Sequence, residues 1–513
     1  MSSPSCTPAS YTPAKLYLGA ACFLAGGAMM VIEICAFRLL APIFGNSVYT
    51  WTALIGVILI AFSAGGFLGG RLVDKHARVN LLGWLLAGAA LLTFFIPALH
   101  LGFGQQFASG GMIGGSILIS LFLFAVPGAL LGAVSPAAVR LYSLMEKDSH
   151  VGAAAGTISM LGSLGSFAGT FLSGFVLLSH FGVRSIFAGC AVLLTLLAIL
   201  AFVLDKAGRK TLTQVSVAAC IGLLSVTLTE EQSSKDVLFA QDSFYHRIEV
   251  SEVGISPHKQ RLLKLDSTAE GAMNPDDGSL VMDYQHYWRL PMLKEKTQLS
   301  SALFIGAGAF GMPEALSREF PQARVDVAEI DPEVIEVGRR FFKLDEHPRV
   351  KAHPGDARRF LHEHANSRWD LIFGDAYAGV RSIPAHLVTQ EFFQQIADHL
   401  TPEGLFVMNA ISAVQGPRGE LLAGLLTTLR TVFPKVEVFA VMGPRQMTQN
   451  VIILASRQDW KPLLTDRYYT TGSWQERLVR TYVPTHLLPL GGTLFTDDFN
   501  PVDRIIARGL FEG

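Results

Sequence analysis

Three acidic residues that could do chemistry each follow a predicted strand: Glu329, Asp356 and Asp375. Parallel strands of an α/β sheet end at one common edge, where such proteins bind ligands. There a carboxylate can accept hydrogen bonds from ribose hydroxyls or a proton from a reacting amine. Asp after a strand is equally typical of turns and caps, so each Asp also has a structural interpretation. Because all three acids should lie at one edge, we favour a ligand-binding site. Glu329 would bind the ribose, Asp356 would bind the adenine amino group, and Asp375 would face the reacting centre.

A glycine-rich turn precedes the first of these acids. The apolar run Ala302–Ile305 leads into Gly306, Gly308 and Gly311, and a second β-like run, Val325–Ile330, follows an amphipathic segment. Glycines let the backbone approach a ligand closely, and the helix N-terminus offers free N–H groups to it. Strand, glycine turn, helix, strand and acid together predict a nucleoside-type cofactor site.

The remaining elements indicate a Rossmann-like fold of the S-adenosylmethionine methyltransferase type. Further strands are predicted at Val350–His353, Asp370–Gly374, Gly404–Asn409, Val436–Val441 and Asn450–Leu454. The last two have no room for a helix between them, whereas a nicotinamide-type domain usually continues with helical crossovers. A helix should begin at Asp331-Pro332, with Asp as N-cap and Pro in the first position.

A small antiparallel β region is expected before this domain. Asp242–Val250 alternates like one strand, Arg261–Leu265 reads as a second, and a turn follows at Asp266-Ser267. The aromatic-rich stretch Asp283–Pro291 is predicted to be helical. The domains expected are residues 1–230, a multi-pass membrane region, 236–297, the β region, and 298–513, the Rossmann-like domain.

Composition separates the two halves. Half of the 513 residues (50%) are hydrophobic and only 16% are charged, with the charges scarce before residue 229. The net charge of −1 gives no case for nucleic-acid binding. All five cysteines lie in the apolar half, so we expect neither a disulfide framework nor a cysteine metal site in the soluble half. No metal is predicted.

The apolar half contains runs of about 20 residues, the length that spans a bilayer. Spans are predicted near Leu16–Phe37, Thr50–Leu72, Leu81–Leu101, Ile113–Val139, Val151–Leu178 and Val183–Leu204, with a shorter seventh run at Leu212–Leu228. Glu33 lies inside the first span, either as a functional acid or as the partner of Arg38. The lipid bilayer is therefore a predicted partner.

Lys and Arg residues concentrate in the even-numbered loops, which predicts that these loops and the N-terminus face the cytoplasm. Seven spans would place the soluble half outside, and six would keep it inside. A nucleoside cofactor made in the cytosol favours the inside. We expect a multi-pass protein of the cell (inner) membrane with a cytoplasmic soluble domain.

These residues resemble the spermidine synthase (polyamine aminopropyltransferase) family in its membrane-fused form, over residues 236–508 and in the membrane half. The family's Glu-Ile-Asp is intact at Glu329-Ile330-Asp331 and its Gly-Asp-Ala at Gly355–Ala357, and Thr496–Asp503 resembles the closing motif of the fused members. Gly69–Lys75 is similar to the loop between the second and third helices of major-facilitator transporters.

The resemblance implies transfer of an aminopropyl group from decarboxylated S-adenosylmethionine to a diamine such as putrescine, and it leaves a homodimer open. With the glycine turn and the acids, it completes the set of candidate site residues. We assign catalytic roles to Asp375, Tyr245 and Tyr284, cofactor binding to Gly306, Gly308, Gly311, Glu329, Asp331, Asp356 and Ala357, and substrate binding to Gln285, His246 and Tyr377.

The chain departs from the family at three acids and in its Tyr-Gln and Tyr-His pairs, the second of which matches Tyr284-Gln285. Ala309 stands where the family's glycine loop carries an acid, Ala378 where its catalytic loop has a second acid, and His286 where an acid follows Tyr-His. Tyr245-His246 replaces a Tyr-Gln pair. An acid at position 309 would attract the free amine of the decarboxylated cofactor and repel the carboxylate of ordinary S-adenosylmethionine.

Three hypotheses follow. The first is the aminopropyltransferase. The second is an S-adenosylmethionine-dependent methyltransferase acting on another substrate, which Ala309 permits. The third is a transporter or sensor that binds a polyamine or nucleoside without turnover, which an acid inside the first span favours.

Overall fold

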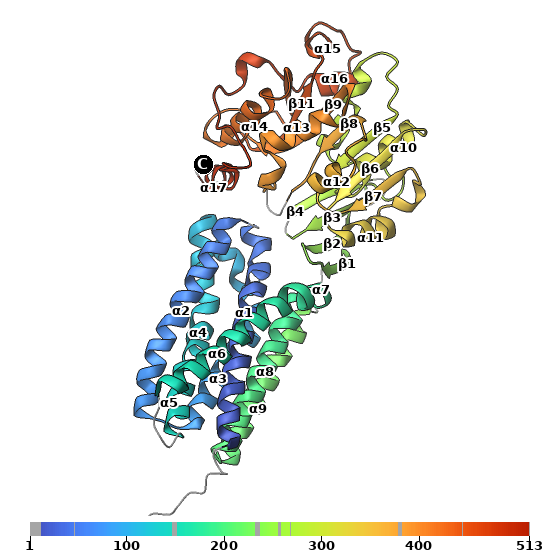
Figure 1. Ribbon diagram of the computed structural model, residues 1–513. Coiled ribbons are helices and arrows are strands. Elements are labelled where there is room, and N and C mark those ends of the chain that lie inside the picture. The colour runs from blue at the N-terminus through green and yellow to red at the C-terminus, as the bar shows by residue number, and fades with distance from the viewer. Residues whose placement is uncertain are drawn as a thin grey trace, which may run out of the picture. The chain divides into compact units, whose positions relative to one another are not determined.

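The computed structural model describes residues 12–45, 47–145, 151–230, 236–254, 258–266, 268–377, 382–443 and 445–511. The chain divides into two compact units, Met1–Ser234 and Lys235–Gly513, each described by itself (Figure 1). A further division of the second unit, between residues 297 and 298, stays a prediction.

The first unit is helical throughout its described residues. Its α-helices are α1 (Thr12–Phe44), α2 (Val48–Lys75), α3 (Val79–Ala108), α4 (Gly111–Gly132), α5 (Val134–Leu144), α6 (Val151–Leu172), α7 (Leu178–His180), α8 (Val183–Leu204) and α9 (Arg209–Glu230), with a π-helical turn at Ser173–Leu177. Within the described ranges, six helical segments are long and apolar enough to cross a membrane, α4 and α5 forming one of them together. The seventh predicted run is helix α9, which packs against α3 and α8 and is not among the six.

Small residues bring the long helices close together. A Cβ atom on Gly65 of α2 would lie 1.9 Å from the carbonyl oxygen of Ala129 in α4. A Cβ atom on Gly165 of α6 would lie 1.8 Å from the carbonyl oxygen of Phe23 in α1. Backbones that touch in this way are typical of helix packing in lipid, where glycine removes the steric barrier.

The second unit begins with a four-stranded antiparallel sheet in the order β1-β2-β3-β4. Its strands are β1 (Val237–Asp242), β2 (Arg247–Val253), β3 (Gln260–Leu265) and β4 (Thr268–Met273). The prediction of one strand over Asp242–Val250 was wrong. The Ser243 hydroxyl accepts hydrogen bonds from the N–H groups of Tyr245 and His246, and the turn that results separates β1 from β2.

The larger sheet has eight strands in the order β12-β10-β11-β9-β8-β5-β6-β7. They are β5 (Ser301–Ile305), β6 (Arg324–Glu329), β7 (Val350–Pro354), β8 (Trp369–Gly374), β9 (Leu400–Ser412), β10 (Lys435–Ala440), β11 (Gln449–Ser456) and β12 (Tyr482–Val483). Strands β5 to β9 pair in parallel, whereas β10, β11 and β12 add antiparallel pairs. The Rossmann-like fold with its closing antiparallel pair is confirmed.

Helices cover both faces of this sheet (Figure 1). They are α10 (Gly311–Glu319), α11 (Pro332–Phe341), α12 (Ala357–Glu363), α13 (Gln390–Asp398), α14 (Glu420–Arg430), α15 (Lys461–Thr465), α16 (Trp474–Val479) and α17 (Val502–Phe511). Alternate residues of β5 enter two separate cores. Phe304 packs in the core under α10 and α11, with the 3₁₀ helix Asp283–Leu293, and Leu303 in the core under α12, α13 and α14. The parallel strands are therefore buried on both faces, and their carboxyl ends carry the polar residues.

Candidate active site

The glycine loop after β5 holds the carboxylate of Glu329. One oxygen of Glu329 accepts a hydrogen bond from the N–H of Ala307 and the other from the N–H of Asp331, both at 2.9 Å. The side chain is buried, and burial raises its pKa above the ordinary value. Each oxygen keeps a lone pair for a further donor, which is what a ribose hydroxyl requires.

Backbone geometry joins this loop to the loop after β8. Gly306 has φ +89°, and a Cβ atom there would lie 2.4 Å from the carbonyl oxygen of Asp375. The N–H of Asp375 donates to the carbonyl of Ile305 at 2.8 Å. Only glycine fits at this position, so the glycine loop and Asp375 meet at one sheet edge. The predicted placement of these two elements at a common edge agrees with this contact.

A strained residue closes the loop. Phe310 has φ +56°, although it is not glycine, and its ring is fully buried. The ring packs where Gly338 of α11 has no side chain, because a Cβ atom there would come within 2.4 Å of it. This packing offsets the cost of the strained backbone. Strained backbone of this kind is common in turns that bind ligands.

Asp375 lies in a network of neutral donors. Its Oδ1 accepts a hydrogen bond from Asn409 Nδ2 at 2.8 Å, and the Tyr284 hydroxyl also donates to its carboxylate. Asn450 Nδ2 donates to Asn409 Oδ1 at 3.1 Å, and the Tyr377 hydroxyl donates to the Asn409 carbonyl at 3.2 Å. Burial raises the pKa of Asp375 to about 6. The carboxylate is held in one orientation and is a stronger base than an exposed Asp.

Two residues of this cluster were missed by sequence reasoning. Glu270 lies on β4, a strand that was not predicted, and burial with the charge of Asp375 raises its pKa to about 7. Asn409 lies on β9, which was predicted to end at that residue, so the rule that singled out the acids could have found it. The signal for Glu270 is a lone acid in a short apolar run after a turn.

Asp331 and Asp356 act as helix caps. Asp331 Oδ1 accepts the N–H of Glu333 at 3.0 Å, and its other oxygen accepts the Ser243 hydroxyl, so the predicted N-cap is confirmed. Asp356 Oδ1 accepts N–H groups from the first turn of α12, and its Oδ2 lies 2.7 Å from His386 Nε2. That contact lowers the pKa of Asp356. A cofactor role for these two acids, and for Ala357 beside Asp356, stays a prediction.

The other predicted substrate residues have local partners. His246 Nδ1 lies 3.0 Å from Asp266 Oδ2, with both side chains buried. Gln285 is buried, and its Oε1 accepts the N–H of Met282 at 3.2 Å. The half-buried Tyr245 lies in the turn between β1 and β2, with its ring edge-on to Phe244. Their substrate roles stay predictions, and Ala378 lies outside the described residues.

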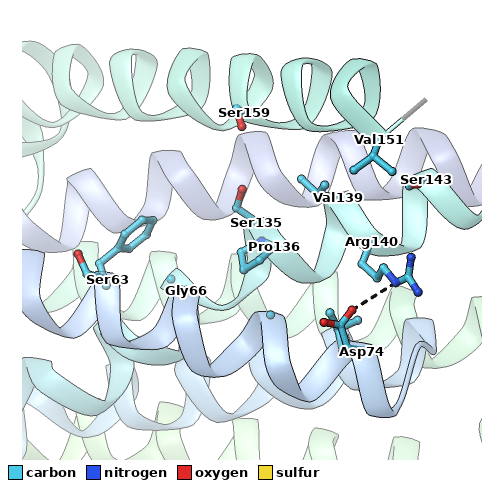
Figure 2. Close-up of a pocket in the computed structure, with 14 residues that line it drawn as sticks. Ser63, Gly66, Asp74, Ser135, Pro136, Val139, Arg140, Ser143, Val151 and Ser159 are labelled. Carbon is cyan, nitrogen blue, oxygen red and sulfur yellow. Dashed lines mark ion pairs between the residues drawn. The ribbon is translucent and has the colours of Figure 1, made fainter. Parts of the chain in front are cut away.

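The membrane unit has a polar cavity of its own, with a volume of about 600 Å³. Figure 2 shows Ser135 on α5 and Ser159 on α6 facing each other across it. At one end Asp74 Oδ1 lies 3.3 Å from Arg140 Nε. Because both side chains are about half exposed or more, this ion pair contributes little to stability in water.

Comparison with known proteins identifies both halves. The family model of the Major Facilitator Superfamily matches residues 16–317, and that of the spermine/spermidine synthase domain matches residues 289–464. A polyamine aminopropyltransferase of Corynebacterium efficiens is 27% identical over 432 residues, which cover 72% of this chain and 79% of the relative. An eEF1A lysine and N-terminal methyltransferase of Bos taurus is 31% identical over 162 residues, or 30% of this chain.

The chain spans only 22% of the length of the bovine relative. Among solved structures, a probable spermidine synthase from Corynebacterium glutamicum aligns with 21% identity and a TM-score of 0.38, covering 52% of this chain and 90% of that one. The multi-pass membrane character follows from the major-facilitator match and the six apolar helices. The chain belongs to the Major Facilitator Superfamily, whose model matches more than half of it, and it also carries a spermine/spermidine synthase domain.

Proposed function

We propose that the chain is a membrane-bound transferase that moves an aminopropyl group from decarboxylated S-adenosylmethionine to a diamine such as putrescine. The observation that carries this proposal is the Asp375 carboxylate, oriented by Asn409 and Tyr284 beside the glycine loop. The family match and the polyamine aminopropyltransferase relatives support the same activity.

The reaction requires a neutral amine next to a sulfonium carbon. The amine lone pair forms the new C–N bond, the C–S bond breaks, and its electron pair stays on sulfur, which leaves a neutral thioether. The amine nitrogen must lose a proton, and Asp375 is placed to accept it and to stabilise the developing positive charge on nitrogen. Glu329 would hold the ribose so that the sulfonium carbon faces that amine.

A methyltransferase is the second candidate. Ala309 supplies no charge on the glycine loop, and the eEF1A lysine and N-terminal methyltransferases are among the relatives. Ordinary S-adenosylmethionine would then donate its methyl group to another amine, with the same proton acceptor. Asp375 is compatible with both reactions, so the products must separate them.

One product assay tests both candidates. The full chain in detergent is incubated with putrescine and either cofactor, and the thioether product is identified by mass spectrometry. Methylthioadenosine together with spermidine is the expected result. Formation of S-adenosylhomocysteine from the ordinary cofactor would refute the proposal and support the methyltransferase instead. If neither product forms while a nucleoside still binds, the transporter or sensor hypothesis gains, and the polar cavity of Figure 2 becomes its first site to test.

We further propose that the soluble half faces the cytoplasm of a cell with an inner membrane. The positive charges of the even-numbered loops and a span count of six support this orientation. Protease added to intact spheroplasts should leave the soluble half uncut. Cleavage there would reverse the assignment.

A further inference from the structure

Two acids of the second unit, Glu270 and Asp375, lie close enough for their charges to interact. Burial, and after it the charge of Asp375, raises the pKa of Glu270 to about 7, and burial raises the pKa of Asp375 to about 6. Neighbouring like charges disfavour ionisation of both groups. A bound ammonium group would relieve this repulsion, because it lets both carboxylates ionise.

A β-bulge places Glu270 at this point. On β3, Leu263 and Lys264 are adjacent, but they pair with Gly271 and Ala269 on β4, so Glu270 is the extra residue between them. Bulges re-aim side chains and occur next to active sites. The backbone of Glu270 also borders the glycine loop, since a Cβ atom on Gly308 would lie 3.0 Å from its carbonyl oxygen.

The same contact between β4 and the glycine loop encloses the side chain at position 309. Ala309 is only 1% exposed. A Cβ atom on Gly271 would lie 2.8 Å from the Ala309 Cβ and 2.4 Å from its nitrogen. The loop thus uses its side chain at 309 for packing against β4. Glu270, the residue before Gly271 on β4, is an acid on the strand that packs against this position.

The Tyr284 hydroxyl contacts the Asp375 side chain and the Glu270 backbone. It donates to the carboxylate of Asp375 and lies 3.2 Å from the carbonyl oxygen of Glu270. Burial raises the pKa of the Tyr284 and Tyr377 phenols above 10. The negative charges of Asp375 and Glu270 raise both pKa values further. Two acids and two tyrosines therefore form one interacting cluster beside the glycine loop.

We propose that Glu270 binds the free amine of the aminopropyl group and makes the site selective for decarboxylated over ordinary S-adenosylmethionine. This inference rests on the proposed aminopropyl transfer. Glu270 takes the place of the loop acid that Ala309 lacks, from a different strand. Ordinary S-adenosylmethionine carries a carboxylate on the same arm, which the anionic pair of Glu270 and Asp375 would repel.

Titration calorimetry on the full chain in detergent tests the proposal with three nucleosides. Methylthioadenosine has no amine or carboxylate on its arm, so its affinity reports only an intact nucleoside site. We expect Glu270→Gln to weaken binding of the decarboxylated cofactor about 10- to 100-fold, the loss typical of a charged hydrogen bond. Ordinary S-adenosylmethionine should bind equally well or better. Methylthioadenosine affinity should stay within about twofold of the original.

Two further variants make the result specific. Glu270→Asp keeps the charge and should retain the preference for the decarboxylated cofactor. Glu249→Gln, which removes an acid of the same small sheet that pairs with Lys264 at 3.0 Å, should change none of the three affinities.

An unchanged ratio of the two cofactor affinities in Glu270→Gln would overturn the inference. An equal loss of all three affinities would also overturn it, since Glu270 would then be only structural. Failure of the unaltered chain to bind methylthioadenosine would instead refute the nucleoside site on which the proposed function depends. Production of S-adenosylhomocysteine by the unaltered chain would refute the aminopropyl transfer itself.

Discussion

Asp375→Asn is the substitution that separates chemistry from binding in this site. The amide is isosteric with the carboxylate, and its oxygen can still accept the hydrogen bond from Asn409 Nδ2 that now measures 2.8 Å. The Tyr284 hydroxyl can still donate a hydrogen bond to the backbone carbonyl of Glu270. The fold and the glycine loop should therefore be preserved, while the proton acceptor is lost.

The expected magnitude follows from the role of the group. A positioned general base contributes about 10²- to 10⁴-fold to a rate, so kcat should fall by that factor. Methylthioadenosine affinity should remain within about twofold. In the unaltered chain, a raised pKa of about 6 means that the carboxylate becomes protonated as the pH falls through 6. The ratio kcat/KM, which reports the ligand-free site, should then drop about tenfold for each further pH unit.

Steady-state kinetics of thioether formation between pH 5 and 8.5 measures both effects. The acid limb near pH 6 should be absent from the residual activity of Asp375→Asn. Asp459→Asn is a suitable control, because Asp459 forms an exposed ion pair with Lys435 at 2.9 Å. Unchanged kcat in Asp375→Asn would remove this residue from the chemistry. Absence of any acid limb down to pH 5 in the unaltered chain would refute the effect of burial.

Four further substitutions test the surrounding structure. Glu329→Gln should weaken methylthioadenosine binding about tenfold, because a charged acceptor is lost, and equal affinity by calorimetry would refute its ribose role. Tyr284→Phe removes a donor that lowers the pKa of Asp375, so the acid limb of kcat/KM should move to higher pH. A limb at the original pH would argue against that hydrogen bond. Glu314→Gln should raise the free energy of unfolding of the soluble half by roughly 3–5 kcal/mol at pH 8–9 and hardly at pH 4. Burial raises the pKa of Glu314 to about 8, so the folded state retains a proton that the unfolded state releases. The folded state of the unaltered chain therefore loses stability as the pH rises from about 4.5 to 8. A stability difference between variant and unaltered chain that does not change with pH in denaturant melts would contradict this. Gly306→Ala places a Cβ atom 2.4 Å from a backbone oxygen at a residue with φ +89°. This substitution should lower the free energy of unfolding by about 1–3 kcal/mol and abolish nucleoside binding. Normal nucleoside binding would mean that the loop can rearrange.

The parallel sheet could be predicted because its strands are apolar and the signals that begin and end its elements lie in neighbouring residues. The glycine turn, the Asp331-Pro332 helix start and the closing antiparallel pair each depend on neighbouring residues. The six apolar helices could likewise be read from length and hydropathy.

The small sheet was harder to predict because its turns depend on side-chain hydrogen bonds. The Ser243 hydroxyl breaks a run that alternates like one strand, and the alternation itself gives no sign of this. Glu270 was missed for a related reason, since its position depends on a bulge in the pairing of β3 with β4. Such a register shift has no local sequence signal.

Capping also limited what the acids could reveal. An acid after a strand is typical of both a ligand site and a helix cap. Asp356 forms the cap of α12, whereas the Asp375 carboxylate contacts side chains from two other segments, Asn409 and Tyr284. Only the tertiary structure distinguishes the two.

A calorimetric titration of the full chain with decarboxylated S-adenosylmethionine tests the central claim most directly, namely that a sulfonium nucleoside binds beside Glu329 and Asp375. The account predicts saturable heat at one ligand per chain, with much weaker binding in Glu329→Gln. Absence of saturable heat from well-folded protein would contradict it.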